Sequence, residues 1–187
     1  MLIAPSVFNP FNSLHNPTSQ QFKMPNYTVS HQFDINEEER TAIAQAITQV
    51  HGSMFSVPVL FVNVTFQPTS QYISYSGGKR APNTINTVTA YVRNVSRPRE
   101  EYVELCHRIE EEWKNAIGPN AGKEKQLTSI FVQGTIVAGW EQGVMIPESG
   151  HDRDWLRQHF ADFQRRAENG EEEMKELIED IEKRKLI

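Results

Sequence analysis

The stretch Met24-Pro25-Asn26-Tyr27-Thr28-Val29-Ser30-His31-Gln32-Phe33 decides the fold of this chain. Its apolar and aromatic residues alternate with polar ones, which predicts a strand with one buried face. A proline stands directly before that strand and follows an internal methionine. If the mature chain begins at Pro25, this residue carries a free secondary amine, and α-amino groups titrate at roughly 7.7–8.0. Inside a longer chain the same nitrogen is an amide, with no hydrogen to donate and no basicity.

Residues 1–24 are expected to lie outside the folded domain. Residues 1–23 contain no acidic side chain, one lysine and three prolines. This composition provides neither a hydrophobic core nor the apolar region of a secretory signal. We interpret residues 1–24 as a disordered leader or as the product of a start assigned too early. An organellar presequence is the alternative, which the absence of arginine disfavours.

The first strand is followed by a predicted helix and a second strand. Asn36 can cap the helix, with Glu39 three residues later completing a capping box. The apolar stripe of this helix consists of Ile43, Ile47, Val50 and His51. A near-continuous apolar run over residues 57–66 then predicts a strand covered on both faces.

The segment after the second strand predicts a hairpin arm. Tyr72 to Tyr75 lead into Ser76-Gly77-Gly78, and paired glycines supply the positive φ that a tight turn demands. A phosphate-binding loop at Gly77-Gly78-Lys79-Arg80 is the alternative, but it lacks the spaced glycines and the following helix of such loops.

A second unit repeats the first. We expect a strand over residues 85–93, a helix opening at Ser96 and a strand over residues 127–133. Gly118-Pro119 ends the helix. Its apolar stripe consists of Tyr102, Leu105, Cys106, Ile109 and Trp113.

Two consecutive β-α-β units predict an α+β fold, with a four-stranded sheet and two helices on one face, related by a pseudo-two-fold axis. Apolar side chains on the other face of the sheet would need burial, for which identical subunits are the natural partner.

The C-terminal segment, residues 161–187, predicts a helical extension. Apolar residues recur at helical spacing after Asn169-Gly170, at Met174, Leu177, Ile178 and Ile181. We expect this amphipathic helix to pack on the body or on a neighbouring subunit. Membrane binding is less favoured, because its polar face is mostly acidic.

Composition disfavours several classes of partner. The net charge is −5 over 187 residues, and eight acidic against four basic side chains lie in residues 167–187. The rest of the chain is nearly neutral, so we expect no nucleic-acid partner and no membrane association. A lone Cys106 excludes an intramolecular disulfide and suits the cytoplasm. The six histidines show no zinc-ligand spacing, so we expect no metal and no cofactor.

Several motifs together resemble a known family. They are Pro25 at a strand start, the helix end Ala46-Ile47-Thr48-Gln49-Val50-His51, the segments 63–67 and 76–78, Arg93 with Arg97, and Glu141-Gln142-Gly143-Val144-Met145-Ile146-Pro147 followed by Gly150-His151 and Trp155. This set resembles the tautomerase superfamily, in its cis-3-chloroacrylic acid dehalogenase-like branch, over residues 25–160. The resemblance implies a cofactor-free enzyme, a homotrimer and a small carboxylate substrate.

The resemblance assigns Pro25 as the proton carrier and His51 as a residue that polarises the substrate. It assigns Glu141 to activating water or moving protons. The structural alternatives are that Pro25 is an ordinary proline of an edge strand, that His51 is a core histidine whose hydrogen bonds are made within the protein, and that Glu141 is an exposed carboxylate in a turn. The branch has a tyrosine near the end of its last core strand, where this chain offers residues 130–133 with Gln133. This departure from the family pattern bears on hydration of a haloacrylate more than on proton transfer.

Arg93 and Arg97 lie between the second unit's first strand and its helix. Cations at a helix N-terminus oppose the helix dipole, typically at a cost of roughly 0.3–1 kcal/mol. Such a placement favours an anion, and guanidinium groups suit a carboxylate. Arg99 competes with Arg97, because one extra residue separates the pair relative to the family. The alternative is that Glu100, Glu101 or another acid pairs with these arginines.

Together these observations predict a tautomerase acting on small enol, keto or unsaturated carboxylates. A hydratase or dehalogenase acting on cis-3-haloacrylate-like acids is the alternative within the family. If Pro25 stays internal, a non-catalytic oligomeric binding module is the alternative from another class.

Overall fold

A computed structural model of the chain describes residues 25–81, 85–93 and 97–187. Four strands form the central sheet in the spatial order β2-β1-β5-β6. Their bounds are Asn26–His31 for β1, Asn63–Pro68 for β2, Thr87–Arg93 for β5 and Ser129–Ile136 for β6. β2 is parallel to β1 and β6 is parallel to β5, whereas the two central strands are antiparallel. Two β-α-β units thus lie side by side, which confirms the predicted architecture.

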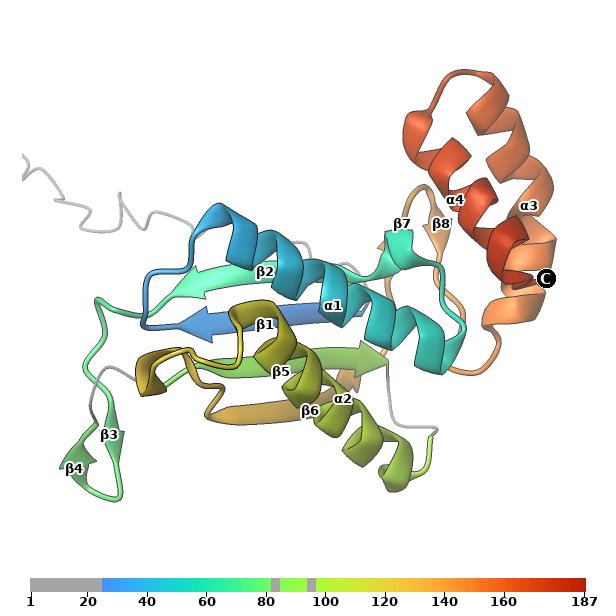
Figure 1. The fold of residues 1–187 in the computed structure, drawn as a ribbon. Coiled ribbons are helices and arrows are strands. Elements are labelled where there is room, and N and C mark those ends of the chain that lie inside the picture. Colours follow the sequence, from blue (N-terminus) through green and yellow to red (C-terminus); the bar gives the residue numbers. More distant parts are fainter. Residues whose placement is uncertain (1–24, 82–84, 94–96) are drawn as a thin grey trace, which may run out of the picture.

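Both crossover helices cover the same face of the sheet (Figure 1). They are α1, Glu37–Phe55, and α2, Arg99–Ile117. The capping box of Asn36 and Glu39 is present at the start of α1, as predicted. The predicted helix start at Ser96 lies outside the described residues, and α2 begins at Arg99 after Pro98.

The core lies between the sheet and these helices. On β1, β5, α1 and α2 the side chains that are at most 2% exposed are Tyr27, Val29, Val88, Ala90, Ile43, Ile47, Leu105 and Ile109. Each position matches the alternation or the helical stripe seen in the sequence. The hydrophobic pattern therefore sets the register of the sheet and the faces of the helices.

The apolar run over residues 57–66 does not form one long strand, so this expectation is wrong. It contains a 3-10 helix, η1 (Val59–Phe61), which Pro58 precedes, and β2 begins only at Asn63. β2 is an edge strand and is only partly buried. The apolar residues before it, Val57 and Phe61, are buried in the core instead, and η1 contacts α1 and the C-terminal helix α4 (Glu172–Arg184).

The hairpin arm is present as predicted. Strands β3 (Tyr75–Ser76) and β4 (Lys79–Arg80) flank Gly77 and Gly78, which have φ of 57° and 76°. Further along, α2 ends before Gly118, and a short 3-10 helix, η2 (Lys123–Lys125), leads to β6. A second hairpin pairs β7 (Trp140–Glu141) with β8 (Val144–Met145).

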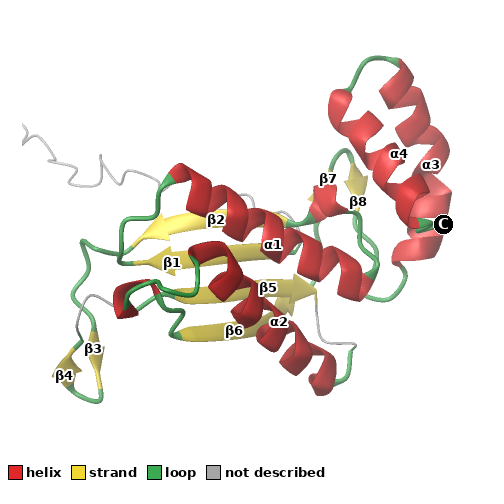
Figure 2. Cartoon of the chain, in the orientation of Figure 1, coloured by secondary structure: helices red, strands yellow, loops and turns green. Residues whose placement is uncertain are grey.

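Two C-terminal helices form a hairpin at one end of the sheet (Figure 2). They are α3, Asp152–Glu168, and α4. Leu156, Phe163, Met174, Leu177 and Ile181 are fully buried where the two helices pack. The expected boundary at residue 160 falls within α3.

The face of the sheet opposite α1 and α2 carries mostly hydroxyl and amide side chains. Thr28, Ser30, Thr87 and Thr89 alternate with the buried residues of β1 and β5, and Phe131 on β6 is 54% exposed. The expectation that this face carries apolar side chains, which identical subunits would bury, is wrong. No helix in the described part of the chain is long and apolar enough to cross a membrane.

Candidate active site

The topology brings Pro25 and Arg93 to the same end of the sheet. Because β1 and β5 are antiparallel, with Asn26 opposite Tyr91, the residue before β1 lies beside the end of β5. The carbonyl of Pro25 accepts a hydrogen bond from the backbone N–H of Asn63 at 3.0 Å, which fixes the proline to the start of β2. The last turns of α1 return to the same end and bring His51 with them.

Two small cavities meet at this point, and both are lined by Pro25 and Arg93. Their volumes are about 20 and 30 Å³. The first is lined by Pro25, His51, Phe55, Val92, Arg93, Arg97, Tyr102 and Ser149. The second contains Glu141, Asp152 and Trp155 among its lining residues. All five site residues predicted from the sequence thus line one or both of the adjoining cavities.

His51 is buried and electrically neutral. The residue is only 5% exposed, and its Nδ1 lies 2.6 Å from the hydroxyl oxygen of Tyr27. Burial, with smaller contributions from the charges of Arg93 and Arg97, lowers the pKa of His51 to about 3. The imidazole is therefore uncharged at neutral pH and can donate or accept one hydrogen bond at each nitrogen according to its tautomer.

Tyr27 is a site residue that the sequence reasoning missed. Alternation placed it correctly in the core, but not in contact with His51. Burial raises the pKa of the Tyr27 phenol well above its usual range, so the hydroxyl keeps its proton. A buried tyrosine hydroxyl needs a hydrogen-bond partner, and this requirement was the signal available in the sequence.

Arg93 is held by a carboxylate and two carbonyls. Its Nη2 donates to Asp152 Oδ1 at 2.7 Å and contacts Oδ2 at 3.0 Å. Its Nη1 donates to the carbonyl oxygens of Pro147 and Glu148 at 3.1 and 3.3 Å. The alternative of an acidic partner for this arginine is therefore realised, by a residue on α3 rather than by Glu100 or Glu101.

Arg97 is held more loosely. Its guanidinium lies over the Phe55 ring, 4.5 Å from the ring centroid. Its Nη1 is 3.4 Å from Glu101 Oε2, and the Glu101 side chain is 43% exposed. Arg97 lines the first cavity, whereas Arg99, the first residue of α2, lines neither. The geometry favours Arg97 over Arg99 as the second arginine of the site.

Glu141 lies inside the protein, not in an exposed turn. It is 4% exposed, and its Oε1 is 3.5 Å from Asn63 Nδ2. Helix α3 secures the β7–β8 hairpin that carries it, because Trp155 Nε1 donates to the Met145 carbonyl at 2.7 Å. Arg166 also donates to the carbonyl of Gln142.

Gln133, named above for the position where the resembled branch has a tyrosine, lies outside both cavities. It is exposed on β6, at the opposite edge of the sheet from β2.

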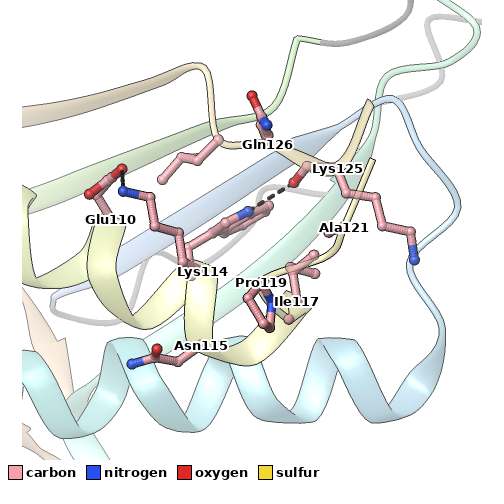
Figure 3. A pocket seen from close by; sticks show the side chains of 11 residues that line it. Glu110, Lys114, Asn115, Ile117, Pro119, Ala121, Lys125 and Gln126 are labelled. Carbon is pink, nitrogen blue, oxygen red and sulfur yellow. Dashed lines mark hydrogen bonds and ion pairs between the residues drawn. The ribbon is translucent and has the colours of Figure 1, made fainter. Parts of the chain in front are cut away.

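A much larger cavity lies away from this site. It has a volume of about 580 Å³ and is formed by the end of α2 and residues 118–127 (Figure 3). Its charged groups are already paired, Lys114 with Glu110 and Lys125 with Glu39. We therefore place the candidate site at Pro25, where the residues suited to chemistry converge, in spite of the smaller volume.

Comparisons with known proteins agree with this architecture. No curated protein matches the chain. A solved structure of N1, a member of the cis-3-chloroacrylic acid dehalogenase (cis-CaaD) family, has 21% identity and a TM-score of 0.57, covering 74% of this chain and 99% of its own. A structure described as a probable enzyme from the thermophilic fungus Aspergillus fumigatus has 24% identity and a TM-score of 0.50, covering 73% and 94%. A fused 4-OT wild-type symmetric trimer has 14% identity and a TM-score of 0.52, covering 65% and 95%.

The family model Tautomerase_3, described as "Putative oxalocrotonate tautomerase enzyme", matches residues 24–160. The match includes Pro25, the four strands of the central sheet, α1, α2, the β7–β8 hairpin and the first half of α3, and it covers well over half of the chain. The predicted resemblance is confirmed: this chain belongs to the Tautomerase_3 family of the tautomerase superfamily.

Proposed function

We propose that the chain, once it begins at Pro25, is a cofactor-free tautomerase acting on small enol or keto carboxylates. The observation that carries this proposal is the convergence of Pro25, His51, Arg93, Arg97 and Glu141 on two adjoining cavities at one end of the sheet. Family membership supports proton-transfer chemistry of the tautomerase type.

In the proposed reaction the Pro25 amine is the proton carrier. As a free base it takes the proton from the enol hydroxyl, and the electron pair of that O–H bond forms the carbonyl. The electrons of the C=C bond then take the same proton from the prolinium nitrogen to form the new C–H bond. The amine is regenerated, so no cofactor is consumed.

The other residues would hold and polarise the substrate. Arg97, near the start of α2, would bind the substrate carboxylate by charge-assisted hydrogen bonds. If the Tyr27 hydroxyl donates to His51 Nδ1, the hydrogen of the neutral imidazole is on Nε2, where it can donate to the far polar end of the substrate. Glu141 would stabilise the enol proton or a water molecule.

Hydration or dehalogenation of an unsaturated acid is the second candidate. The buried position of Glu141 in the cavity that also contains Pro25 favours it, since a carboxylate there could activate water. The pKa of the Pro25 amine would choose between the two reactions, because a base near neutrality suits tautomerisation and a raised value suits protonation of carbon.

We also propose a homotrimer in the cytoplasm. The fused 4-OT neighbour is described as a symmetric trimer, and the lone Cys106 suits a reducing compartment. Light scattering tests the assembly: a mass near that of a single chain at micromolar concentration would contradict it.

The experiment that tests the function uses four proteins and one substrate. The chain beginning at Pro25 should accelerate ketonisation of phenylenolpyruvate, and Pro25→Ala should reduce kcat/KM by about 10²-fold or more, as general acid–base catalysis requires. A chain that retains Met24 acylates Pro25 and should lose activity to the same extent, whereas Pro119→Ala, at an exposed proline in the loop after α2, should not. Equal rates for the chain that begins at Pro25 and the chain that retains Met24 would contradict the proposal and favour a binding module.

A further inference from the structure

Arg93, which lines both cavities of the candidate site, already holds a carboxylate. Asp152, the first residue of α3, contacts Arg93 Nη2 with both carboxylate oxygens, at 2.7 and 3.0 Å. Its side chain is 16% exposed and that of Arg93 is 15% exposed, so solvent screens this pair less than a surface pair. Asp152 thus occupies the arginine in the way that a bound substrate anion would.

The second terminal nitrogen of Arg93, Nη1, is occupied as well. It donates to the carbonyl oxygens of Pro147 and Glu148. A substrate carboxylate arriving at Arg93 would have to displace Asp152 or lie beside it. Two carboxylates sharing one guanidinium repel each other, and a partly buried position strengthens that repulsion.

Arg97 remains open to a substrate carboxylate. Its contact with Glu101 is long, at 3.4 Å, and that carboxylate is 43% exposed, a setting in which ion pairs are weak. Arg97 lies beside His51 in the first cavity, whereas Asp152 and Glu141 lie in the second. The first cavity therefore contains a usable cation in Arg97, whereas the second contains the acidic side chains of Asp152 and Glu141 beside the occupied Arg93.

We infer that Asp152 is a specificity-determining residue that restricts the site to monocarboxylates, with the single substrate carboxylate on Arg97, and that rejects dicarboxylates by occupying Arg93. This inference rests on the proposed function for the location of the site. A second carboxylate on the substrate would meet Asp152 and Glu141 in the second cavity. Removing the charge of Asp152 frees Arg93 and makes room for a dianion.

The test compares two ligands with the same six-carbon diene skeleton, sorbate with one carboxylate and muconate with two. Binding is measured by titration calorimetry at neutral pH and fixed ionic strength, on the full chain beginning at Pro25. The wild-type protein should bind sorbate at least about tenfold more tightly than muconate. Asp152→Asn, which keeps a similar shape, should tighten muconate binding about tenfold or more and leave sorbate within about threefold.

Asp154→Asn is the matched control. It removes the same charge from the same helical turn, but Asp154 pairs with Arg157 at the surface and its side chain is 80% exposed. The control should keep the wild-type ratio of affinities. Asp152→Glu, which restores the carboxylate, should keep the preference for sorbate and shows whether the charge or the fold was altered.

Two results would overturn the inference. One is a wild-type protein that binds muconate as tightly as sorbate; the other is an Asp152→Asn variant in which both affinities change by the same factor, as a purely structural role of Asp152 predicts. Turnover is not needed for this comparison. If neither the wild-type protein nor any variant turned over phenylenolpyruvate, this result would contradict the proposed function but not the inference about Asp152.

Discussion

At the residue scale, the Tyr27–His51 pair determines the charge of the site. The imidazole is buried and lies 2.6 Å from a phenol that keeps its proton, and two guanidinium groups disfavour its protonation. A neutral His51 leaves the arginines as the cations of the first cavity. This charge distribution suits a substrate with one anionic end and one neutral polar end.

The lowered pKa of His51 predicts how stability depends on pH. In the unfolded chain the histidine binds a proton below its ordinary pKa of 6.5, whereas in the folded chain it stays neutral until the pH nears 3. The unfolded state therefore binds more protons in this window, and the free energy of unfolding falls as the pH falls, by at most about 1.4 kcal/mol per pH unit for one proton.

Urea unfolding at pH 7 and pH 5 checks this prediction. His51→Gln should lose much less stability between the two pH values than the wild-type protein does. His107→Gln, which removes an exposed histidine from α2, should keep the wild-type dependence. Identical pH dependence in wild type and His51→Gln would contradict a buried neutral imidazole.

The sequence could predict the site residues that stand at the ends of elements. Pro25 precedes a strand, Arg93 ends one, and His51 is in the last turns of a helix, so local patterns and topology place all three. The Asp152–Arg93 ion pair joins residues on β5 and α3, and the sequence pattern contains no signal for that choice of partner. Tyr27 was assigned to the core by alternation, but its hydroxyl partner depends on the packing of α1.

At the element scale, α4 fastens the end of α1 that carries His51. Arg184 donates from Nη2 to the Gly52 carbonyl and from Nη1 to the Val57 carbonyl at 2.9 Å. Asp180 accepts the Val59 N–H at 3.0 Å and pairs with Arg184. These contacts explain why residues 57–61 form a loop and a 3-10 helix: α4 follows them by more than a hundred residues, so a local apolar run could not reveal it.

We predict that Arg184→Met lowers the free energy of unfolding by about 1.5–3 kcal/mol, because it leaves two part-buried carbonyls without their charged donor. Arg157→Met removes an arginine whose side chain is 54% exposed at the surface of α3 and should change stability by no more than about 0.5 kcal/mol. Denaturant unfolding of the two variants measures the difference. Equal stabilities would show that α4 does not hold α1.

At the scale of the whole molecule, the fold was predictable because each local pattern agreed with the others. Alternation predicted β1, the helical stripes predicted α1 and α2, and two β-α-β units in succession predicted the topology of the sheet. The polar far face was not foreseen, since the sequence pattern was interpreted from its buried side only. The C-terminal helices were foreseen as helices, but their packing over one end of the sheet depends on contacts distant in sequence.

Nitrogen-15 NMR of Pro25 in the chain that begins there tests the central claim most directly. If Pro25 is the base of a tautomerase, its amine nitrogen should titrate near neutrality, with a pKa at or below the roughly 7.7–8.0 of an ordinary α-amino group. This requires that burial and the guanidinium groups of Arg93 and Arg97, which disfavour a further positive charge, outweigh the carboxylates of Glu141 and Asp152 in the second cavity. A nitrogen that shows no titration between pH 5 and pH 10, or that stays protonated above pH 9, would contradict the account.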